Sequence, residues 1–349
     1  MLCVFLLLFI ILSFRKDRVD INYEKPFVSV FVAARNEEKN ILRCLEALSQ
    51  LNYSNLEILI GNDHSEDTTL DIIADFIVDK PHFRVFNIQK NIGLAKGKAN
   101  VLAQLANAAK GDFFFITDAD TKVPKDWINQ MLNAFDEKTG VVTGITTLKA
   151  TTLFQYFQQI DWLYALSLVK SVTDLGFPVT SMGNNMAIRK EAYFETGGYE
   201  NLPFSITEDF QLFWEVVKNG WHYKNLFHNG TLARSKPTDS FVQLLHQRKR
   251  WMIGAMQLPW HFLFLLYIQA SFYPLLIILF FICWQGALFV LVLKSFLQMI
   301  YIARSYTRLR QKIPTVKLFL FEIYSGFLAI SLLLFYFAPF KVIWKGRKY

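Results

Sequence analysis

Two aspartates one residue apart follow a continuous apolar run, in the segment FFFITDAD that ends with Asp118 and Asp120. Two carboxylates at the end of a strand can direct a compact negative charge at one point. A hard divalent cation such as Mg²⁺ or Mn²⁺ takes oxygen ligands. It commonly binds protein carboxylates and a diphosphate at the same time. The pair therefore predicts a Mg²⁺ or Mn²⁺ site. A strand-end turn is the alternative explanation, because aspartate is common in turns.

Two further acids open a predicted helix, where Glu208 and Asp209 follow Thr207. A carboxylate within hydrogen-bond reach of a hydroxyl can take its proton while the oxygen attacks a carbon. Asp209 is the candidate base, and Glu208 has an orienting or structural role. Helix capping by Thr207 is the alternative, but it explains the threonine without explaining the two acids.

A third motif, QRKRW, covers residues 247–251. The planar fork of Arg250 could grip a diphosphate, and Trp251 offers a flat apolar face to a ring of a second substrate. Taken alone, the motif suits a basic helix anchored to lipid. Its place after the two acidic motifs and before long apolar stretches favours a role of Gln247, Arg250 and Trp251 in substrate binding.

The segments around these residues alternate between strand-like and helix-like patterns. Strands are predicted at residues 27–34, 56–63, 83–88 and 113–120, and helices at residues 40–51, 68–78 and 98–109. This alternation predicts a doubly wound, mostly parallel α/β sheet. Ligands of such sheets bind at the carboxyl ends of the strands, where Arg35, Asp63 and Asp118 fall.

The composition indicates a soluble domain attached to a membrane. The 349 residues are 53% hydrophobic and 19% charged, which is too apolar for an ordinary soluble protein and too charged for a bundle of membrane helices alone. The apolar residues concentrate in residues 2–14 and 262–340, whereas residues 15–260 read as a globular domain.

Residues 2–14 would rise about 20 Å as a helix, less than the roughly 30 Å of a hydrocarbon core. A cleaved signal peptide would need a basic start and a small-residue cleavage site, so a short membrane anchor is favoured. Residues 240–258 suit a helix in the membrane interface. Residues 262–293 are too long for one straight span and should split near Trp284 into two segments, the second running to about Ala303. Residues 316–338 form a last apolar segment.

The number of crossings stays open. Three C-terminal crossings would place the basic tail, residues 341–348, outside the cell. Two crossings would keep the tail inside and leave one apolar segment embedded without crossing.

The net charge of +8 comes from basic residues that flank the apolar segments. They are Arg15, Lys16, Arg18, Arg304, Arg308, Arg310, Lys312 and the tail 341–348. Such clusters mark the cytoplasmic side and attract anionic lipids. No nucleic acid partner is expected, because that would require a basic stripe on the soluble domain. The spacing of Cys3, Cys44 and Cys283 fits no metal site, and we expect reduced thiols.

In combination the motifs resemble the family 2 glycosyltransferases, in the membrane-bound branch that includes cellulose, chitin and hyaluronan synthases and ceramide glucosyltransferases. The resemblance covers about residues 27–257. It is carried by VSVFVAARNEEKNILRCLEAL, GNDHSEDTT, GKANVL, TDADT, MGNNMAIRKEAYFETGGY, TED and QRKRW. The second of these departs from the family's Asp-Asp-Gly-Ser-x-Asp turn at Asn62 and His64.

The resemblance implies a GT-A fold, inverting chemistry and a nucleotide-sugar donor, usually a UDP-sugar. The implied donor contacts are Ala33, Arg35, Glu37, Asp63, Lys98 and Asp118, and the implied metal ligands are Asp118 and Asp120. The implied acceptor or pyrophosphate contacts are Gly183, Asn184, Glu208, Gln247, Arg250 and Trp251, with Asp209 as the catalytic base.

The predicted protein is a multi-pass enzyme of the cell (inner or plasma) membrane with a cytoplasmic catalytic domain. Its predicted parts are a membrane anchor (1–15), a GT-A domain (24–238), an amphipathic interface helix (239–259) and a transmembrane region (260–349). The acceptor is expected to be a lipid or a lipid-linked glycan, and a processive polysaccharide synthase is the alternative. A non-catalytic scaffold or transporter component is the alternative of another class, but it should lack one of the acidic motifs.

Overall fold

The computed structural model describes residues 2–15, 17, 25–341, 343–344 and 347–348. They form two compact units: a sheet unit, residues 16–147 and 172–236, and a helical unit, residues 1–15, 148–171 and 237–349. Several positions of the predicted layout lie outside the described residues, namely Met1, Lys16, Arg18, Glu24, Lys345 and Tyr349.

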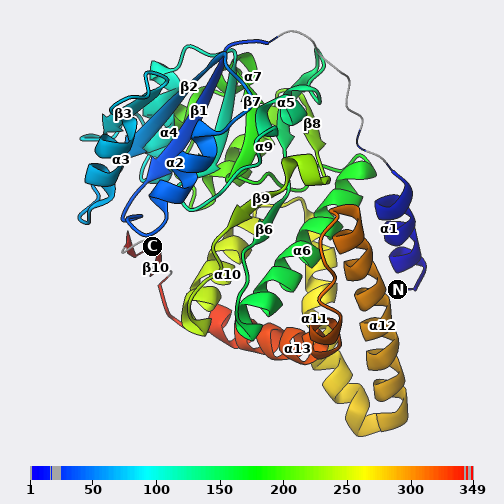
Figure 1. Ribbon diagram of the computed structural model, residues 1–349. Helices are drawn as coiled ribbons and strands as arrows, with labels where there is room; N and C mark the ends of the chain where they lie inside the picture. The colour runs from blue at the N-terminus through cyan, green and yellow to red at the C-terminus, as the bar shows by residue number, and fades with distance from the viewer. Residues whose placement is uncertain (1, 16, 18–24, 342, 345–346, 349) are drawn as a thin grey trace. The chain divides into compact units, whose positions relative to one another are not determined.

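A seven-stranded sheet in the order β3-β2-β1-β4-β7-β5-β8 forms the centre of the sheet unit (Figure 1). The strands are β1 (Val28–Ala34), β2 (Leu56–Asn62), β3 (Phe83–Asn87), β4 (Phe113–Asp118), β5 (Thr139–Thr143), β7 (Asn185–Arg189) and β8 (His222–Asn225). Strands β1 to β4 pair in parallel, and β7 runs antiparallel between β4 and β5. The predicted doubly wound, mostly parallel sheet is confirmed.

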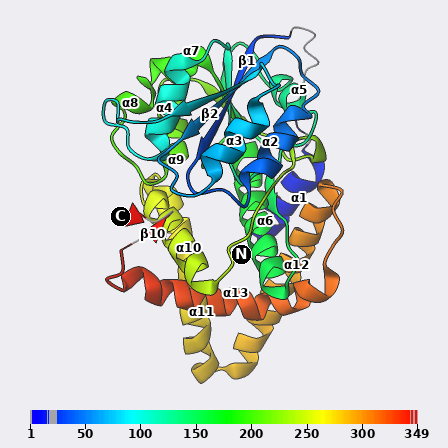
Figure 2. The ribbon, with the colours of Figure 1, turned by 60° about the vertical axis from the view of Figure 1, so that its left-hand side comes forward.

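Helices cover both faces of this sheet (Figure 2). They are α2 (Ile41–Ser49), α3 (Thr69–Ile77), α4 (Lys98–Ala108), α5 (Trp127–Leu132), α7 (Lys190–Glu195), α8 (Gly198–Asn201) and α9 (Glu208–Lys218). A small second sheet pairs β6 (Thr146–Leu148) with β9 (Ala233–Ser235). The strands and helices predicted between residues 27 and 120 all form at the predicted places.

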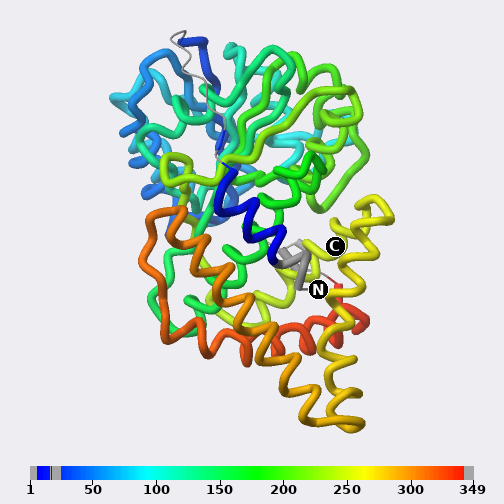
Figure 3. Tube along the Cα trace, turned by 90° about the vertical axis from the view of Figure 1, so that its right-hand side faces the viewer, coloured from blue at the N-terminus to red at the C-terminus, as the bar shows by residue number. Residues whose placement is uncertain are grey.

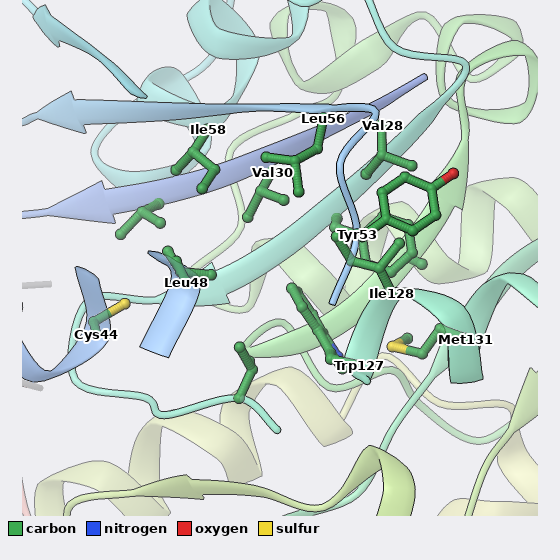
Figure 4. Close-up of a cluster of buried hydrophobic side chains, with 14 of the residues drawn as sticks. Val28, Val30, Cys44, Leu48, Tyr53, Leu56, Ile58, Trp127, Ile128 and Met131 are labelled. Carbon is green, nitrogen blue, oxygen red and sulfur yellow. The ribbon is translucent and has the colours of Figure 1, made fainter. Parts of the chain in front are cut away.

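Side chains of the sheet enter a core on each of its faces, which explains why the strands are almost continuously apolar. Val28 and Val30 join the core that contains Trp127 (Figure 4). Phe31 joins the opposite core and packs on Phe114, with their ring centroids 5.0 Å apart. Two buried faces fix the register of β1, because a slip by one residue would exchange its two sets of side chains.

The helical unit contains the long apolar helices. They are α1 (Leu2–Phe14), most of α6 (Leu153–Asp174), α10 (Phe241–Ala255), α11 (Trp260–Ile282), α12 (Trp284–Arg308) and α13 (Thr315–Phe337), followed by the short strands β10 (Ile343–Trp344) and β11 (Arg347–Lys348). Among the described residues, α11, α12 and α13 are long and apolar enough to cross a membrane. The split predicted near Trp284 is confirmed, and α12 continues beyond its predicted end at Ala303 to Arg308.

Helices α11 and α12 form a hairpin, and α13 runs across it rather than along it (Figures 1 and 2). Helix α1 lies beside the carboxyl-terminal half of α12 (Figure 3). Arg304 and Arg308 of α12 donate hydrogen bonds to the carbonyls of Ser13 (2.8 Å) and Leu12 (2.9 Å) at the end of α1. Two arginines therefore satisfy carbonyls that a helix end leaves without partners.

One ion pair joins α12 to α13 inside the helical unit. Lys294 Nζ lies 2.7 Å from Glu322 Oε2, and the two side chains are only 13% and 14% exposed. Tyr273 of α11 donates a hydrogen bond to Glu322 (2.9 Å). These two charges on apolar helices are thus paired, as burial in an apolar environment requires.

Candidate active site

The carboxyl edge of the parallel strands brings the predicted donor residues together. Asp118 ends β4 beside Ala33 of β1, while Arg35 and Asp63 lie in the loops that follow β1 and β2. Arg35 Nη1 donates a hydrogen bond of 2.7 Å to the carbonyl of Asp63. The two loops are thus held to each other at the edge where such sheets bind ligands.

Lys98 connects two of the acidic motifs. Its Nζ lies 2.7 Å from Asp118 Oδ1 and 3.0 Å from Glu208 Oε1. The Lys98 side chain is 13% exposed and that of Glu208 is 8% exposed. Lys98 begins α4 directly after Gly97, whose φ of +58° is in the region that favours glycine. The structure therefore brings together one residue from each of three separate sequence motifs.

The acids keep Lys98 positively charged. Burial by itself lowers the pKa of the amino group, but Asp118, Glu208 and Asp209 raise it more, so the net shift is upward. An ammonium group held by carboxylates is a strong, oriented positive charge. It can offset negative charge that develops on a substrate at this edge.

Asp209, at the start of α9, is held by two backbone amides. Its Oδ2 accepts the N–H of Gly183 at 2.8 Å, and its Oδ1 accepts the N–H of Phe210 at 2.9 Å. Burial and the neighbouring Glu208 raise the pKa of Asp209, against the opposing effects of Lys98 and the two amides. A carboxylate with a raised pKa is a better proton acceptor near neutral pH.

Gly183 leaves no room for a side chain. A Cβ at this position would lie 2.7 Å from both Cβ and Oδ2 of Asp209. Ser181 makes a second hydrogen bond to this residue, because its Oγ donates to the carbonyl of Asp209 at 2.8 Å. The neighbouring Asn184 is held through its Oδ1, which accepts from Thr146 Oγ1 at 3.0 Å. The segment before β7 therefore fixes the orientation of the Asp209 carboxylate.

Asp120 lies in the turn after β4 and is half-buried. Its Oδ1 accepts hydrogen bonds from Ser235 and Thr121, each at 3.1 Å, and its carbonyl accepts from Arg43 at 2.6 Å. These contacts fix the turn that carries the Asp-Ala-Asp motif.

The described residues contain no group of three or more His, Cys, Asp or Glu that could hold a metal ion by themselves. Asp118 and Asp120 are two partly exposed carboxylates. Mg²⁺ is commonly bound by one or two carboxylates together with substrate phosphates. The donor set therefore fits a cation shared with a diphosphate.

Glu37 is buried in the loop after β1 and takes part in its internal bonding. Its N–H donates to Thr69 Oγ1 at 2.7 Å, and its Oε2 accepts from Asn40 Nδ2 at 2.7 Å. A donor contact by Glu37 stays a prediction.

Thr207 directly precedes α9, but its side chain makes no capping hydrogen bond. Helix capping, the alternative explanation of this threonine, is therefore wrong. Its hydroxyl instead lies 3.3 Å from that of Ser205.

The predicted residues Gln247, Arg250 and Trp251 lie on α10 of the helical unit, whereas the acids lie in the sheet unit. The ring of Trp251 packs on Trp162 of α6, with centroids 4.5 Å apart. A role of these three residues in binding the acceptor or the pyrophosphate stays a prediction.

The sequence motifs do not single out Tyr199, whose side chain is buried beside the acids. Its hydroxyl has no hydrogen-bond partner among the described residues. Burial, Glu208, Asp209 and Asp118 raise its pKa well above the ordinary value. The sequence signal was the preceding glycine pair, because Gly197 (φ +85°) and Gly198 (φ +66°) adopt a turn that other residues disfavour.

The fold and the site define a GT-A-type glycosyltransferase architecture with apolar helices. Residues 3–349 match the sequence profile of the family described as Glycosyl transferase family 21, and the chain belongs to that family. The predicted resemblance to membrane-bound, family 2-like glycosyltransferases is thereby confirmed.

Two curated relatives have similar sequences. A beta-monoglucosyldiacylglycerol synthase of Nostoc sp. (strain PCC 7120) is 28% identical over 249 residues, which are 70% of this chain and 52% of that protein. A poly-beta-1,6-N-acetyl-D-glucosamine synthase of Staphylococcus aureus (strain COL) is 28% identical over 239 residues, which are 67% of this chain and 56% of that protein. The chain thus spans about half the length of the curated relatives it matches.

A solved structure with a similar fold is a mannosyltransferase from Pyrobaculum calidifontis in complex with GDP-Man and Mn²⁺. The match has a TM-score of 0.62 and 15% sequence identity, and it covers 97% of this chain and 94% of that chain. At this identity the likeness concerns the fold alone, and it confirms the predicted GT-A-type fold.

Proposed function

We propose that the protein transfers a sugar, with inversion at the anomeric carbon, from a nucleotide-diphosphate sugar to a hydroxyl of a membrane lipid or lipid-linked glycan. The observation that carries the proposal is the position of Lys98, which contacts Asp118 and Glu208 beside Asp209. Three motifs that resemble donor, metal and base motifs of glycosyltransferases thereby meet at one edge of the sheet.

Asp209 takes the proton of the acceptor hydroxyl. The hydroxyl oxygen then forms a bond to the anomeric carbon, and the bond from that carbon to the diphosphate oxygen breaks on the opposite side. The amides of Gly183 and Phe210 hold the carboxylate in one orientation, which reduces the entropic cost of reaching the reactive geometry.

The departing diphosphate gathers negative charge near Lys98, whose ammonium offsets it. Asp118 and Asp120 would hold Mg²⁺ or Mn²⁺, and the ion when bound neutralises further charge on the diphosphate. The Mn²⁺ in the Pyrobaculum calidifontis enzyme supports this choice of cation. The sugar donor is inferred to be a UDP-sugar.

A lipid acceptor is the preferred inference. A relative at 28% identity is named for a glucosyldiacylglycerol product, and the described part of the chain has three helices suited to a membrane. A processive polysaccharide synthase remains the second candidate, because the Staphylococcus aureus relative, equally identical, is named for a polysaccharide. The enzyme is inferred to lie in the cell membrane with its sheet unit in the cytoplasm, since basic residues flank its apolar helices.

The test uses the full chain purified in detergent, supplied with Mn²⁺, a panel of nucleotide sugars and diacylglycerol, with products identified by mass spectrometry. We expect a product with one or a few sugars. A long polymer would exclude the lipid inference.

Replacing the proposed base tests the mechanism. Asp209→Asn should retain donor binding and lower transfer about 10²- to 10⁴-fold, because the amide cannot accept the proton. Asp71→Asn, at an exposed position of α3, is the matched control and should behave as wild type. Near-normal transfer by Asp209→Asn would remove Asp209 from the mechanism.

A further inference from the structure

Tyr199 of α8 has a buried hydroxyl that the proposed chemistry does not use. Its side chain is 2% exposed, and the hydroxyl has no hydrogen-bond partner among the described residues. Burial raises the pKa of this hydroxyl well above its ordinary value, and of the neighbouring acids Glu208 adds the largest effect. The hydroxyl therefore keeps its proton and is a hydrogen-bond donor near a carboxylate. A buried donor without a partner is unfavourable, and its presence in a folded protein requires an explanation.

The surroundings of Tyr199 hold its ring in place. Its N–H donates to the hydroxyl of Tyr193 at 3.1 Å, and the two ring centroids lie 5.8 Å apart. The next residue, Glu200, accepts the N–H of Leu94 on its carbonyl at 2.7 Å. Helix α8 is thus attached to the loop that leads into α4. The Tyr199 ring and the start of α4 therefore keep fixed positions relative to each other.

The Glu208 carboxylate is bonded to a different group, the ammonium of Lys98. Lys98 Nζ lies 3.0 Å from Glu208 Oε1 and 2.7 Å from Asp118 Oδ1, and the Glu208 side chain is only 8% exposed. In the proposed chemistry this same ammonium serves the diphosphate. A buried carboxylate that loses its cation is strongly destabilised unless another donor replaces the cation.

We propose that Tyr199 is a positioning residue whose hydroxyl donates a hydrogen bond to Glu208 when Lys98 leaves this carboxylate for the diphosphate of the donor. The part of the inference that concerns the donor rests on the proposed function, whereas the exchange of partners at Glu208 does not. No covalent bond changes in this step, because one N–H···O contact is replaced by one O–H···O contact. All three side chains belong to the sheet unit.

This exchange makes the movement of Lys98 less costly. Without the hydroxyl, each transfer of the ammonium to the diphosphate would leave a buried carboxylate unpaired, and the penalty would weaken donor binding. With the hydroxyl, Glu208 keeps a partner and stays beside Asp209. Tyr199 thus contributes to donor affinity without touching the donor.

A double-mutant cycle in the absence of nucleotide tests the exchange itself. Lys98→Met removes the ammonium and so imitates its departure from Glu208. In the wild-type background, Tyr199→Phe removes a hydroxyl without a partner and should leave the Tm unchanged or raise it. In the Lys98→Met background the same change should lower the Tm by about 2–4 °C, because the hydroxyl now serves Glu208. The difference between the two backgrounds measures the coupling.

Tyr193→Phe is the matched control. Its hydroxyl already accepts the N–H of Tyr199, so its removal should lower the Tm by the same amount in both backgrounds. An equal Tm change for Tyr199→Phe in both backgrounds, whether a decrease, an increase or none, would overturn the inference.

A binding measurement tests the link to the donor and separates it from the proposed function. The full chain in detergent is titrated with UDP and, in parallel, with GDP, each with Mn²⁺. The nucleotide that binds wild type more tightly should bind Tyr199→Phe about tenfold more weakly, although the Tm of this variant without nucleotide is no lower than that of wild type. A merely structural hydroxyl could not give this pair of results.

The outcomes of the titration are distinct. Unchanged nucleotide affinity in Tyr199→Phe would overturn the inference and leave the proposed function intact, even if Lys98→Met fails to fold. A wild type that binds neither nucleotide would contradict the proposed donor, and with it the donor-linked part of the inference. The Tm cycle then decides the exchange at Glu208 by itself.

Discussion

Gly183 is the position where one methyl group would disturb the proposed base. A methyl group added here would approach the Asp209 carboxylate to 2.7 Å, so Gly183→Ala should displace the carboxylate and lower kcat at least about a hundredfold. Overpacking of this kind costs about 1–3 kcal/mol of stability, which thermal unfolding would report. Gly286→Ala, where the nearest atom to an added Cβ is a cysteine sulfur 3.2 Å away, is the control and should keep full activity.

The pH dependence of transfer should reflect the environment of Asp209. Burial and Glu208 raise its pKa, and only the deprotonated carboxylate accepts a proton, so activity should fall with decreasing pH at a higher pH than for an ordinary aspartate. Glu208→Gln removes a negative neighbour, lowers the pKa of Asp209 and moves this acid limb to lower pH. Profiles of kcat/KM against pH for wild type and variant would measure the shift. A shift of the variant's acid limb to higher pH would contradict the assignment.

At the scale of single elements, Lys249 ties α10 to the end of α13. Its Nζ donates to the carbonyls of Phe335 (3.2 Å), Ala338 (2.9 Å) and Phe340 (3.0 Å). Lys249→Met would leave these carbonyls without their charged donor, at a cost of about 1–3 kcal/mol, and so should lower the Tm in detergent. Lys312→Met, at an exposed position, should leave the Tm unchanged, and equal Tm values for both variants would contradict the role of Lys249.

The ion pair between α12 and α13 allows a stricter test of packing. Glu322→Gln leaves the Lys294 ammonium without its charged partner and should cost about 3–5 kcal/mol. The double variant Lys294→Met with Glu322→Met should recover most of this loss, because apolar residues of similar size often replace a buried pair at little cost. Thermal unfolding in detergent measures the stability of both variants. A double variant less stable than Glu322→Gln would contradict the expectation that apolar residues can replace the Lys294–Glu322 pair.

Local patterns were sufficient to predict the elements that position the donor residues. Parallel strands end at one edge, so the positions of Arg35, Asp63 and Asp118 followed from the alternation alone. The contact of Lys98 with Glu208 could not follow, because it joins α4 to α9 across a long stretch of sequence. The Asp161–Arg248 ion pair could not follow either, because it joins α6 to α10 across a long stretch of sequence.

At the scale of the whole molecule, the arrangement of α11, α12 and α13 addresses the number of membrane crossings. Helix α13 runs across the α11–α12 hairpin (Figure 2), although its length and composition would also suit a span. We therefore expect two crossings, by α11 and α12, with α13 embedded in the membrane and the basic tail on the cytoplasmic side.

Labelling of the Cys283 thiol can test this membrane topology. Cys283 is a free, exposed thiol between α11 and α12, so a membrane-impermeant maleimide should label it from outside intact cells. Cys44 should stay unlabelled even in opened cells, because burial, Asp120 and Asp118 raise the pKa of its thiol and the thiolate is the reactive form. In a Cys3→Ser, Cys283→Ser background, Lys341→Cys should be labelled only after the cells are opened. Labelling of Lys341→Cys from outside would show that α13 crosses the membrane and would overturn the two-span arrangement.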